Sequence, residues 1–175
     1  LIHKDIVPIV EGIIARKKFV YLCTNGLLLE KRIDRFTPSP YLTFSVHLDG
    51  LKDHHDRAVD QAGTFDIAVR AIRKAKDLGF RVNVACTLFD QLDAGEAAEF
   101  FNFCTNDLQV EGVTISPGYA YERAPDQKHF LSRRKTKQLF RDIFAKPDAK
   151  TWRFSQSTLF LDFLAGNQSY KCTPW

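Results

Sequence analysis

Two kinds of hydrophobic spacing alternate along this chain. Apolar residues recur at helical intervals in 6–15 and 64–78, whereas 19–25 and 41–50 are short, extended-looking runs rich in β-branched and aromatic residues. The predicted elements are helices at 6–15, 27–33, 64–78, 96–108 and 132–144, and strands at 19–25, 41–50, 81–89 and 112–118. Alternating strands and helices are typical of an α/β fold with parallel strands and crossover helices. The pattern fits either an open doubly wound sheet or a barrel.

Local signals mark the ends of two of these helices. Thr64 is predicted to cap the long helix, and Gly79 to end it. Between the second strand and that helix, the run Asp53, His54, His55, Asp56 has the residue types of a metal site. We expect a solvated turn there instead.

Polar residues alternate with aliphatic ones within each predicted strand. Parallel strands covered on both faces normally read as unbroken aliphatic runs. One face is expected to hold the following polar or small side chains: Tyr21, Cys23 and Asn25; Thr43, Ser45, His47 and Asp49; Asn83, Ala85 and Thr87; Thr114 and Ser116. We interpret this polar face as a shared interior, most accessible at the carboxyl ends of the strands, where barrel enzymes place their sites. Ordinary hydrogen bonding within an open sheet is the alternative.

Composition narrows the classes of partner. The chain has 175 residues, 45% of them hydrophobic, which is enough for a substantial core. Its net charge is +4, with basic and acidic residues interspersed, so nucleic acid is not an expected partner. The four cysteines are far apart in sequence, which argues against a metal site held by this chain alone. A cytoplasmic protein with reduced thiols is expected, and peripheral association with a membrane stays open.

The segments TNG at 24–26 and SVHLDG at 45–50 make the chain resemble radical S-adenosylmethionine (SAM) enzymes. Those enzymes use a partial barrel of six strands, with a CxxxCxxC loop after the first strand and a GGE-type motif after the second. LIHKDI at 1–6 looks like the residues that follow such a motif. The resemblance therefore implies a partial TIM-like (β/α) barrel, with about the last four of six βα units in 1–120. Residues 121–175 would hold a loop, helices and the start of a C-terminal extension.

The implied cofactors are S-adenosylmethionine and a 4Fe–4S cluster, with the cluster ligands upstream of this chain. A chain without them is expected to be inactive alone. It is also expected to expose a strand edge and to be poorly soluble.

A narrower resemblance covers nearly the whole chain. EGIIARKKFVYLCTN, FRVNVACTLF, SPGYAYERAPDQ and FSQSTLFLDFLAGNQSYKCTPW are similar to the adenosylhopane synthase family of hopanoid biosynthesis. That family attaches a 5'-deoxyadenosyl group to diploptene, a polycyclic hydrocarbon alkene. The implied partners are diploptene or a similar hydrocarbon, and an electron donor such as flavodoxin or ferredoxin.

The same resemblance gives Cys23 the role of hydrogen-atom donor. Addition of an adenosyl carbon radical to the alkene leaves a tertiary carbon radical, and the S–H bond of a thiol is weak enough to quench it. A buried apolar setting, with Tyr21 nearby, would keep the thiol neutral. The alternative is that Cys23 is simply a small hydrophobic residue buried in the core. Cys86 and Cys104 are expected in the core, and Cys172 is left undecided.

The resemblance suggests five residues for SAM binding, each with a short hydrogen-bonding side chain: Thr24, Asn25, Ser45, Asn83 and Ser116. His47 and Asp49 resemble an acid–base pair, but radical addition needs no proton relay, so an interior hydrogen bond or loop anchor is favoured. The apolar segment 152–166 could line a substrate passage or face a membrane, although core packing is favoured.

Two other functions stay open. The first is a peptide-modifying radical SAM enzyme, a group that shares SVHLDG. The second is a non-catalytic barrel remnant that binds an apolar ligand or a protein. A CxxxCxxC motif upstream of the chain would exclude the remnant.

Overall fold

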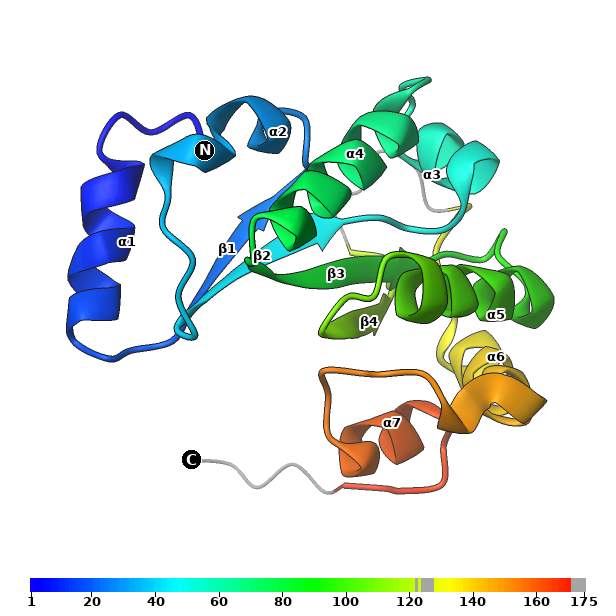
Figure 1. The fold of residues 1–175 in the computed structure, drawn as a ribbon. Coiled ribbons are helices and arrows are strands. Elements are labelled where there is room, and N and C mark those ends of the chain that lie inside the picture. The colour runs from blue at the N-terminus through cyan, green and yellow to red at the C-terminus, as the bar shows by residue number, and fades with distance from the viewer. Residues whose placement is uncertain (122, 124–127, 171–175) are drawn as a thin grey trace.

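The computed structural model describes residues 1–121, 123 and 128–170. Its centre is a parallel sheet in the order β1 (Val20–Thr24), β2 (Leu42–His47), β3 (Arg81–Leu88) and β4 (Gly112–Pro117), as Figure 1 shows. The strands follow one another in chain order, as in a barrel wall. A doubly wound sheet would reverse its strand order at a switch point. The described sheet therefore has the layout of part of a barrel, which confirms the predicted fold class.

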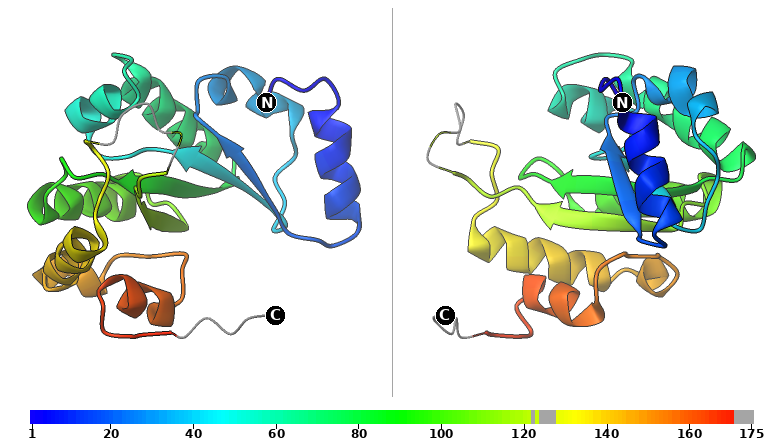
Figure 2. Two further views of the ribbon diagram at one scale, coloured as in Figure 1. Left: turned by 180° about the vertical axis from the view of Figure 1, so that it is seen from behind. Right: turned by 90° about the vertical axis from the view of Figure 1, so that its left-hand side faces the viewer.

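Helices connect the strands and cover the sheet (Figures 1 and 2). The α-helices are α1 (Ile6–Ala15), α2 (Leu29–Arg32), α3 (Lys52–Ala58), α4 (Thr64–Asp77), α5 (Ala94–Asn102), α6 (Arg133–Phe144) and α7 (Thr158–Leu164). The 3-10 turns η1 (Ile33–Arg35) and η3 (Pro147–Lys150) and the π-helical turn η2 (Phe103–Asp107) complete the set. The helix predicted at 96–108 is thus α5 followed by η2. No helix in the described part of the chain is long and apolar enough to cross a membrane.

The aliphatic face of the sheet packs against α4 (Figure 1). Phe44, Val46, Val82 and Val84 are fully buried, as is the facing helix residue Ile72. Burial of such side chains stabilises the fold by roughly 1.5–3 kcal/mol each. The turn after β1 comes close to the same helix. A Cβ added to Gly26, whose φ is +81°, would lie 3.0 Å from the Cα of Ala68.

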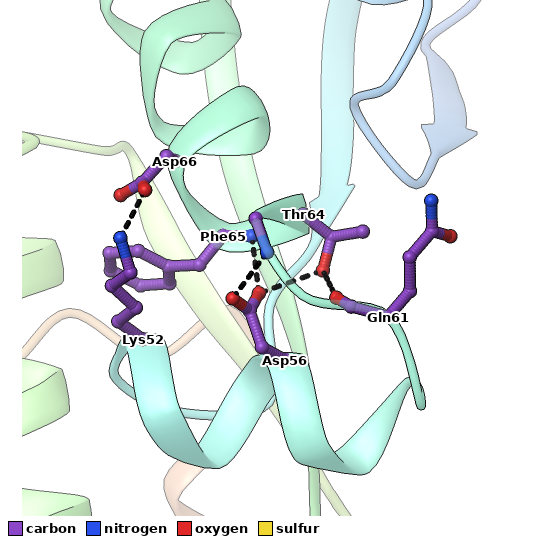
Figure 3. Close-up of polar contacts among 7 residues, drawn as sticks. Lys52, Asp56, Gln61, Thr64, Phe65 and Asp66 are labelled. Carbon is purple, nitrogen blue, oxygen red and sulfur yellow. Dashed lines mark hydrogen bonds and ion pairs between the residues drawn. The ribbon is translucent and has the colours of Figure 1, made fainter.

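The connection between α3 and α4 differs from the sequence expectation (Figure 3). Residues 52–58 form a helix and not a solvated turn, and His55 is the buried residue of this helix. Thr64 is the first residue of α4, and the cap comes from α3 instead. The Asp56 carboxylate accepts bonds from the Gly63 N–H at 2.6 Å, the Phe65 N–H at 2.8 Å and the Thr64 hydroxyl at 2.9 Å. These donors, led by the Phe65 N–H, lower the pKa of Asp56. A carboxylate at a helix N-terminus satisfies N–H groups that the helix leaves free.

The two edges of the sheet have different surroundings. No described strand pairs with the outer side of β1, as expected of an exposed edge. Beyond β4, a short segment runs parallel to the sheet. The Val113 N–H donates to the Arg153 carbonyl at 2.7 Å, and the Ser155 N–H donates to the Val113 carbonyl at 3.0 Å. This segment brings residues far along the chain to the sheet.

The apolar segment 152–166 divides between core and surface. Trp152 and Leu164 are buried, and the ring of Trp152 lies 5.2 Å from that of Phe101. Leu159, Phe160 and Phe163 are instead 54%, 41% and 40% exposed. The core-packing expectation is therefore confirmed for only part of the segment.

Candidate functional site

The polar face of the sheet is opposite the face that α4 covers. In parallel strands, residues in register point to the same side, and Cys23, Ser45 and Asn83 are in register across β1, β2 and β3. The alternate positions Leu22, Phe44 and Val82 belong to the aliphatic core. The predicted division of the strands into two faces is therefore confirmed, and it aligns a thiol, a hydroxyl and an amide in one row.

Cys23 is exposed at the edge-strand end of this row. The sulfur lies on the polar face and not on the wall covered by helices. Its setting differs from the expected one, because Tyr21 is 56% exposed and does not form a buried apolar surround. The physical reason is that β1 is the outermost described strand, so neighbours shield Cys23 on one side only.

Ser45 and Asn83 occupy similar positions but differ in availability. Both are nearly buried. Among the described residues, the Ser45 hydroxyl makes no hydrogen bond. The Asn83 amide is engaged: Nδ2 donates to the Thr114 hydroxyl at 3.0 Å and to the Val84 carbonyl at 3.1 Å, and Oδ1 accepts from the Ser155 hydroxyl. Asn83 therefore ties three parts of the fold together, whereas Ser45 offers a group to a ligand.

The other three predicted SAM residues lie apart from this row. The Thr24 hydroxyl accepts from the Gly26 N–H at 3.1 Å, and Asn25 Oδ1 accepts from the Leu27 N–H at 3.3 Å, so both stabilise the turn after β1. Such local bonds are typical of turn residues. Ser116 is exposed near the end of β4, in register with Thr87. The SAM-binding roles of these residues stay predictions.

A histidine–aspartate group lies at the carboxyl end of β2. Asp49 is 2% exposed, and its Oδ1 accepts from the Thr87 N–H at 2.7 Å and lies 2.8 Å from His47 Nε2. The Asp49 N–H donates to His55 Nδ1 at 3.2 Å. This geometry agrees with the loop-anchor interpretation, because the group fastens the end of β2 to β3 and α3. The sequence did not predict the role of His55, because its polar neighbours in 53–56 indicated a solvated turn.

The three imidazoles in this region respond differently to their surroundings. The hydrogen bond to Asp49 raises the pKa of His47, whereas burial lowers the pKa of His54 and His55. His47 is partly exposed on the polar face, so it is the imidazole here that can meet a ligand on that face.

A pH-dependent stability difference is expected between the protein and its His47→Gln variant. A raised folded-state pKa stabilises the fold fully below the ordinary value of 6.5, and this contribution disappears as pH rises through the raised pKa. Stability lost on substitution should therefore be larger at pH 6 than at pH 9. Urea unfolding of both proteins across this range measures this difference in stability, and the contributions of His54 and of the burial of His55 are common to both proteins. A pH-independent difference would contradict the assignment.

Residues from the C-terminal segment complete the β4 side of the site. The Ile115 N–H donates to Gln156 Oε1 at 3.1 Å, and Gln156 Nε2 donates to the Ile115 carbonyl. With the Ser155–Asn83 bond, these contacts hold the segment on the sheet. Nothing local in the sequence signals them, because Ser155 and Asn83 are 72 positions apart.

Gly112 makes room for this arrangement. A Cβ at this position would lie 2.6 Å from Ser155 Oγ. Gly112→Ala is expected to lower the free energy of unfolding by ~1–3 kcal/mol through overpacking. Adding Ser155→Ala to this variant should recover part of the loss, since it removes the clashing oxygen. Chemical denaturation of the wild type, both single variants and the double variant tests the coupling. Strict additivity would show that the two positions do not clash.

The remaining cysteines are not at this face. Cys86 and Cys104 are buried in the core, as predicted, and burial raises the pKa of both thiols. Cys172 lies outside the described residues. Within the described chain, no group of three or more His, Cys, Asp or Glu side chains could hold a metal ion.

Two cavities lie beyond the carboxyl ends of the strands. One of about 250 Å³ is lined by residues that include Asn25, His47 and Thr64. Another of about 490 Å³ has Phe89 and Phe130 in its wall, with ring centroids 6.1 Å apart. Barrel enzymes bind their ligands at this end of the sheet.

Two protein families match the chain. Residues 1–104 match the family described as the radical SAM superfamily, and residues 113–175 match one described as a domain of unknown function, DUF3463. The domain boundary predicted at residue 120 stays a prediction.

Curated relatives and solved structures agree with the first match. GTP 3',8-cyclase of Clostridium perfringens (strain 13 / Type A) is 22% identical over 120 residues, 67% of this chain and 37% of that protein. Molybdenum cofactor biosynthesis protein 1 of Dictyostelium discoideum is 27% identical over 114 residues, 63% of this chain and 18% of that protein. The chain therefore spans well under half the length of these relatives.

Among solved structures, Streptococcus suis SuiB superposes with a TM-score of 0.71 at 13% identity, covering 95% of this chain and 40% of that one. The structure described as native anSMEcpe with bound AdoMet gives 0.58 at 18% identity, covering 86% and 38%. These likenesses confirm the fold. Members of the matched superfamily use SAM together with a 4Fe–4S cluster. Since the superfamily match covers more than half of its residues, this chain belongs to the radical SAM superfamily.

Proposed function

We propose that this protein is a radical SAM enzyme of hopanoid biosynthesis that transfers a 5'-deoxyadenosyl group to diploptene and forms adenosylhopane. The observation that carries the proposal is the position of the Cys23 thiol on the polar face, in register with Ser45. The sequence similarity to adenosylhopane synthases supports the choice of substrate.

The polar face suits part of a SAM molecule. The Ser45 hydroxyl makes no bond within the described chain and can both donate to and accept from a ribose hydroxyl. His47, two residues further along the same face, is held by Asp49 and offers its remaining ring nitrogen. Asn83 Nδ2 would have to give up its contact to Thr114 or Val84 in order to donate to a ligand. Ser45 and His47 are therefore the residues here that would hold SAM, which when bound supplies the 5'-deoxyadenosyl group.

The described residues do not suit an iron–sulfur cluster. Such a cluster needs a set of thiolates within reach of one another. Cys23 is exposed on the polar face, while Cys86 and Cys104 are enclosed in the core, where burial favours the protonated thiol. No step of the proposal is therefore assigned to cluster ligands from this part of the chain.

Cys23 would complete the reaction by quenching the substrate radical. Its S–H bond breaks homolytically, a C–H bond forms at the tertiary carbon of the hopane skeleton, and a thiyl radical remains on the sulfur. One electron from a flavodoxin- or ferredoxin-type donor and one proton from solvent restore the thiol. The place of Cys23 on the polar face suits both events, because a substrate bound at that face lies on the same side of the sheet as the sulfur.

The cavity beyond β3 supports an apolar substrate. Phe89 and Phe130 give it aromatic wall area, and Ala58 adds an aliphatic contact. Hydrocarbon ligands are held by such surfaces, because burial removes apolar area from water. The position of the cavity at the carboxyl end of the sheet matches the usual place of a barrel site.

Anaerobic reconstitution tests the proposal. The full-length protein that contains this chain is purified and supplied with iron, sulfide, SAM, an electron donor and diploptene, and mass spectrometry monitors the products. The expected result is a compound with the combined mass of diploptene and the 5'-deoxyadenosyl group plus one hydrogen. Reductive cleavage of SAM without any adenosylated hydrocarbon would reject diploptene as the substrate.

Peptide modification is a second candidate. The SVHLDG segment supports it, and one superposed structure is described as SuiB bound to its precursor peptide SuiA, with a TM-score of 0.70. Adding a peptide library to the same assay distinguishes the two candidates. A mass change in a peptide, with diploptene unaltered, would favour this candidate.

A further inference from the structure

Helices α6 and α7 form a surface in which apolar and basic side chains are neighbours. On α7, Leu159, Phe160 and Phe163 are exposed, while Leu164 of the same helix and Ala165, which follows it, are buried. The rings of Phe160 and Phe163 lie 6.4 Å apart, and that of Tyr170 lies 5.4 Å from Phe163. A continuous exposed apolar patch of this kind usually marks an interaction site.

Basic residues of α6 border this patch. Arg141 Nε donates to the Ala165 carbonyl at the end of α7, at 2.7 Å. The aliphatic stem of Lys137 packs against Gly166, the residue after Ala165. A Cβ added to Gly166 would lie 2.7 Å from Lys137 Cδ. Arg134, one helical turn before Lys137, is also exposed. Figures 1 and 2 show α6 and α7 side by side, on the opposite side of the molecule from α4.

The positive charge of the chain is concentrated in this region. Residues 128–170 contain nine Lys and Arg but three Asp and Glu, a net charge of +6, whereas the whole chain carries +4. The rest of the chain is therefore net negative. An anionic surface would attract the α6–α7 side and repel the opposite side, which orients the molecule.

We infer that the α6–α7 surface, made of Arg134, Lys137, Arg141, Leu159, Phe160 and Phe163, docks on an anionic phospholipid bilayer. The protruding apolar side chains enter the interface, and the cations pair with lipid phosphates, as in other proteins that bind a membrane surface without crossing it. Anionic lipid matches both features, since it offers negative charge above an apolar layer. The inference stands on charge and exposure and does not depend on diploptene as the substrate.

Vesicle flotation of the purified protein tests this inference. The probes are vesicles of phosphatidylcholine alone and vesicles that also contain phosphatidylglycerol. Binding to the anionic vesicles should be at least about tenfold stronger and should weaken as salt is raised. The Phe160→Ser/Phe163→Ser and Arg134→Glu/Lys137→Glu variants should each lose about tenfold, whereas Ile2→Ser and Arg73→Glu, which alter exposed residues elsewhere, should bind as the wild type does.

Several results would overturn it. Equal binding to both kinds of vesicle would reject the role of charge, and unchanged binding by the α6–α7 variants would reject the surface. Binding of an RNA oligonucleotide but not of vesicles would assign the surface to nucleic acid. Loss of a dimer in the same variants, with no vesicle binding by the wild type, would assign it to self-association. Thermal unfolding monitored by circular dichroism confirms that every variant is folded.

Discussion

Replacing Cys23 with alanine is expected to leave reductive cleavage of SAM intact and to lower the yield of adenosylhopane by about tenfold or more, the effect of ~1.4 kcal/mol or more on the quenching barrier. The carbon–carbon bond can still form, because that step does not use the thiol. The tertiary radical then lacks its hydrogen donor and follows other routes, which gives unsaturated or rearranged products. Quantifying all adenosylated hydrocarbons by mass spectrometry measures this shift.

Isotope labelling sharpens the test of Cys23. A thiol proton exchanges with water, so a reaction in D₂O should place one deuterium in the product of the wild-type protein. The matched control is Tyr21→Phe, because Tyr21 is an exposed residue on the same face of β1 whose O–H could also donate. This control should retain the product and its label. An unchanged product in Cys23→Ala, or a loss in Tyr21→Phe instead, would remove Cys23 from the mechanism.

Asp49→Ala is expected to lower the free energy of unfolding by ~3 kcal/mol, the cost of leaving buried donors of a polar network unpaired. The substitution removes the acceptor of the Thr87 N–H and the partner of His47, at a position that is 2% exposed. The end of β2 would then lose its side-chain bond to β3. Because Ser45 and His47 are on this strand, SAM binding should weaken as well.

Urea denaturation monitored by circular dichroism measures the effect of Asp49→Ala. Asp53→Ala is the matched control, since Asp53 is an exposed aspartate in the following helix and its loss should change stability by no more than ~0.5 kcal/mol. Asp49→Asn should fall between the two, because it keeps one acceptor oxygen without the charge. Equal stability of Asp49→Ala and Asp53→Ala would show that the carboxylate does not hold the strands together.

The order of elements and the division of the strands into two faces followed from local sequence. Strand periodicity places Cys23, Ser45 and Asn83 on one side of their strands, and parallel register then aligns them. Cys86 and Cys104 were correctly assigned to the core for the same reason, as their neighbours at strand or helix spacing are apolar. These properties depend on residues close together in the chain, so a sequence pattern can reveal them.

The sequence by itself thus determined the α/β architecture and the chemistry of the polar face, whereas only the tertiary structure decided which of those polar groups are free. Asn83 was expected to bind SAM, yet its amide holds Ser155, and Asp56, read as part of a turn, caps a helix that begins eight residues later. The exposure of Cys23 likewise depends on β1 being an edge strand. Hydrogen-bond partners and shielding come from segments distant in the chain, and no local periodicity records which of these segments will meet.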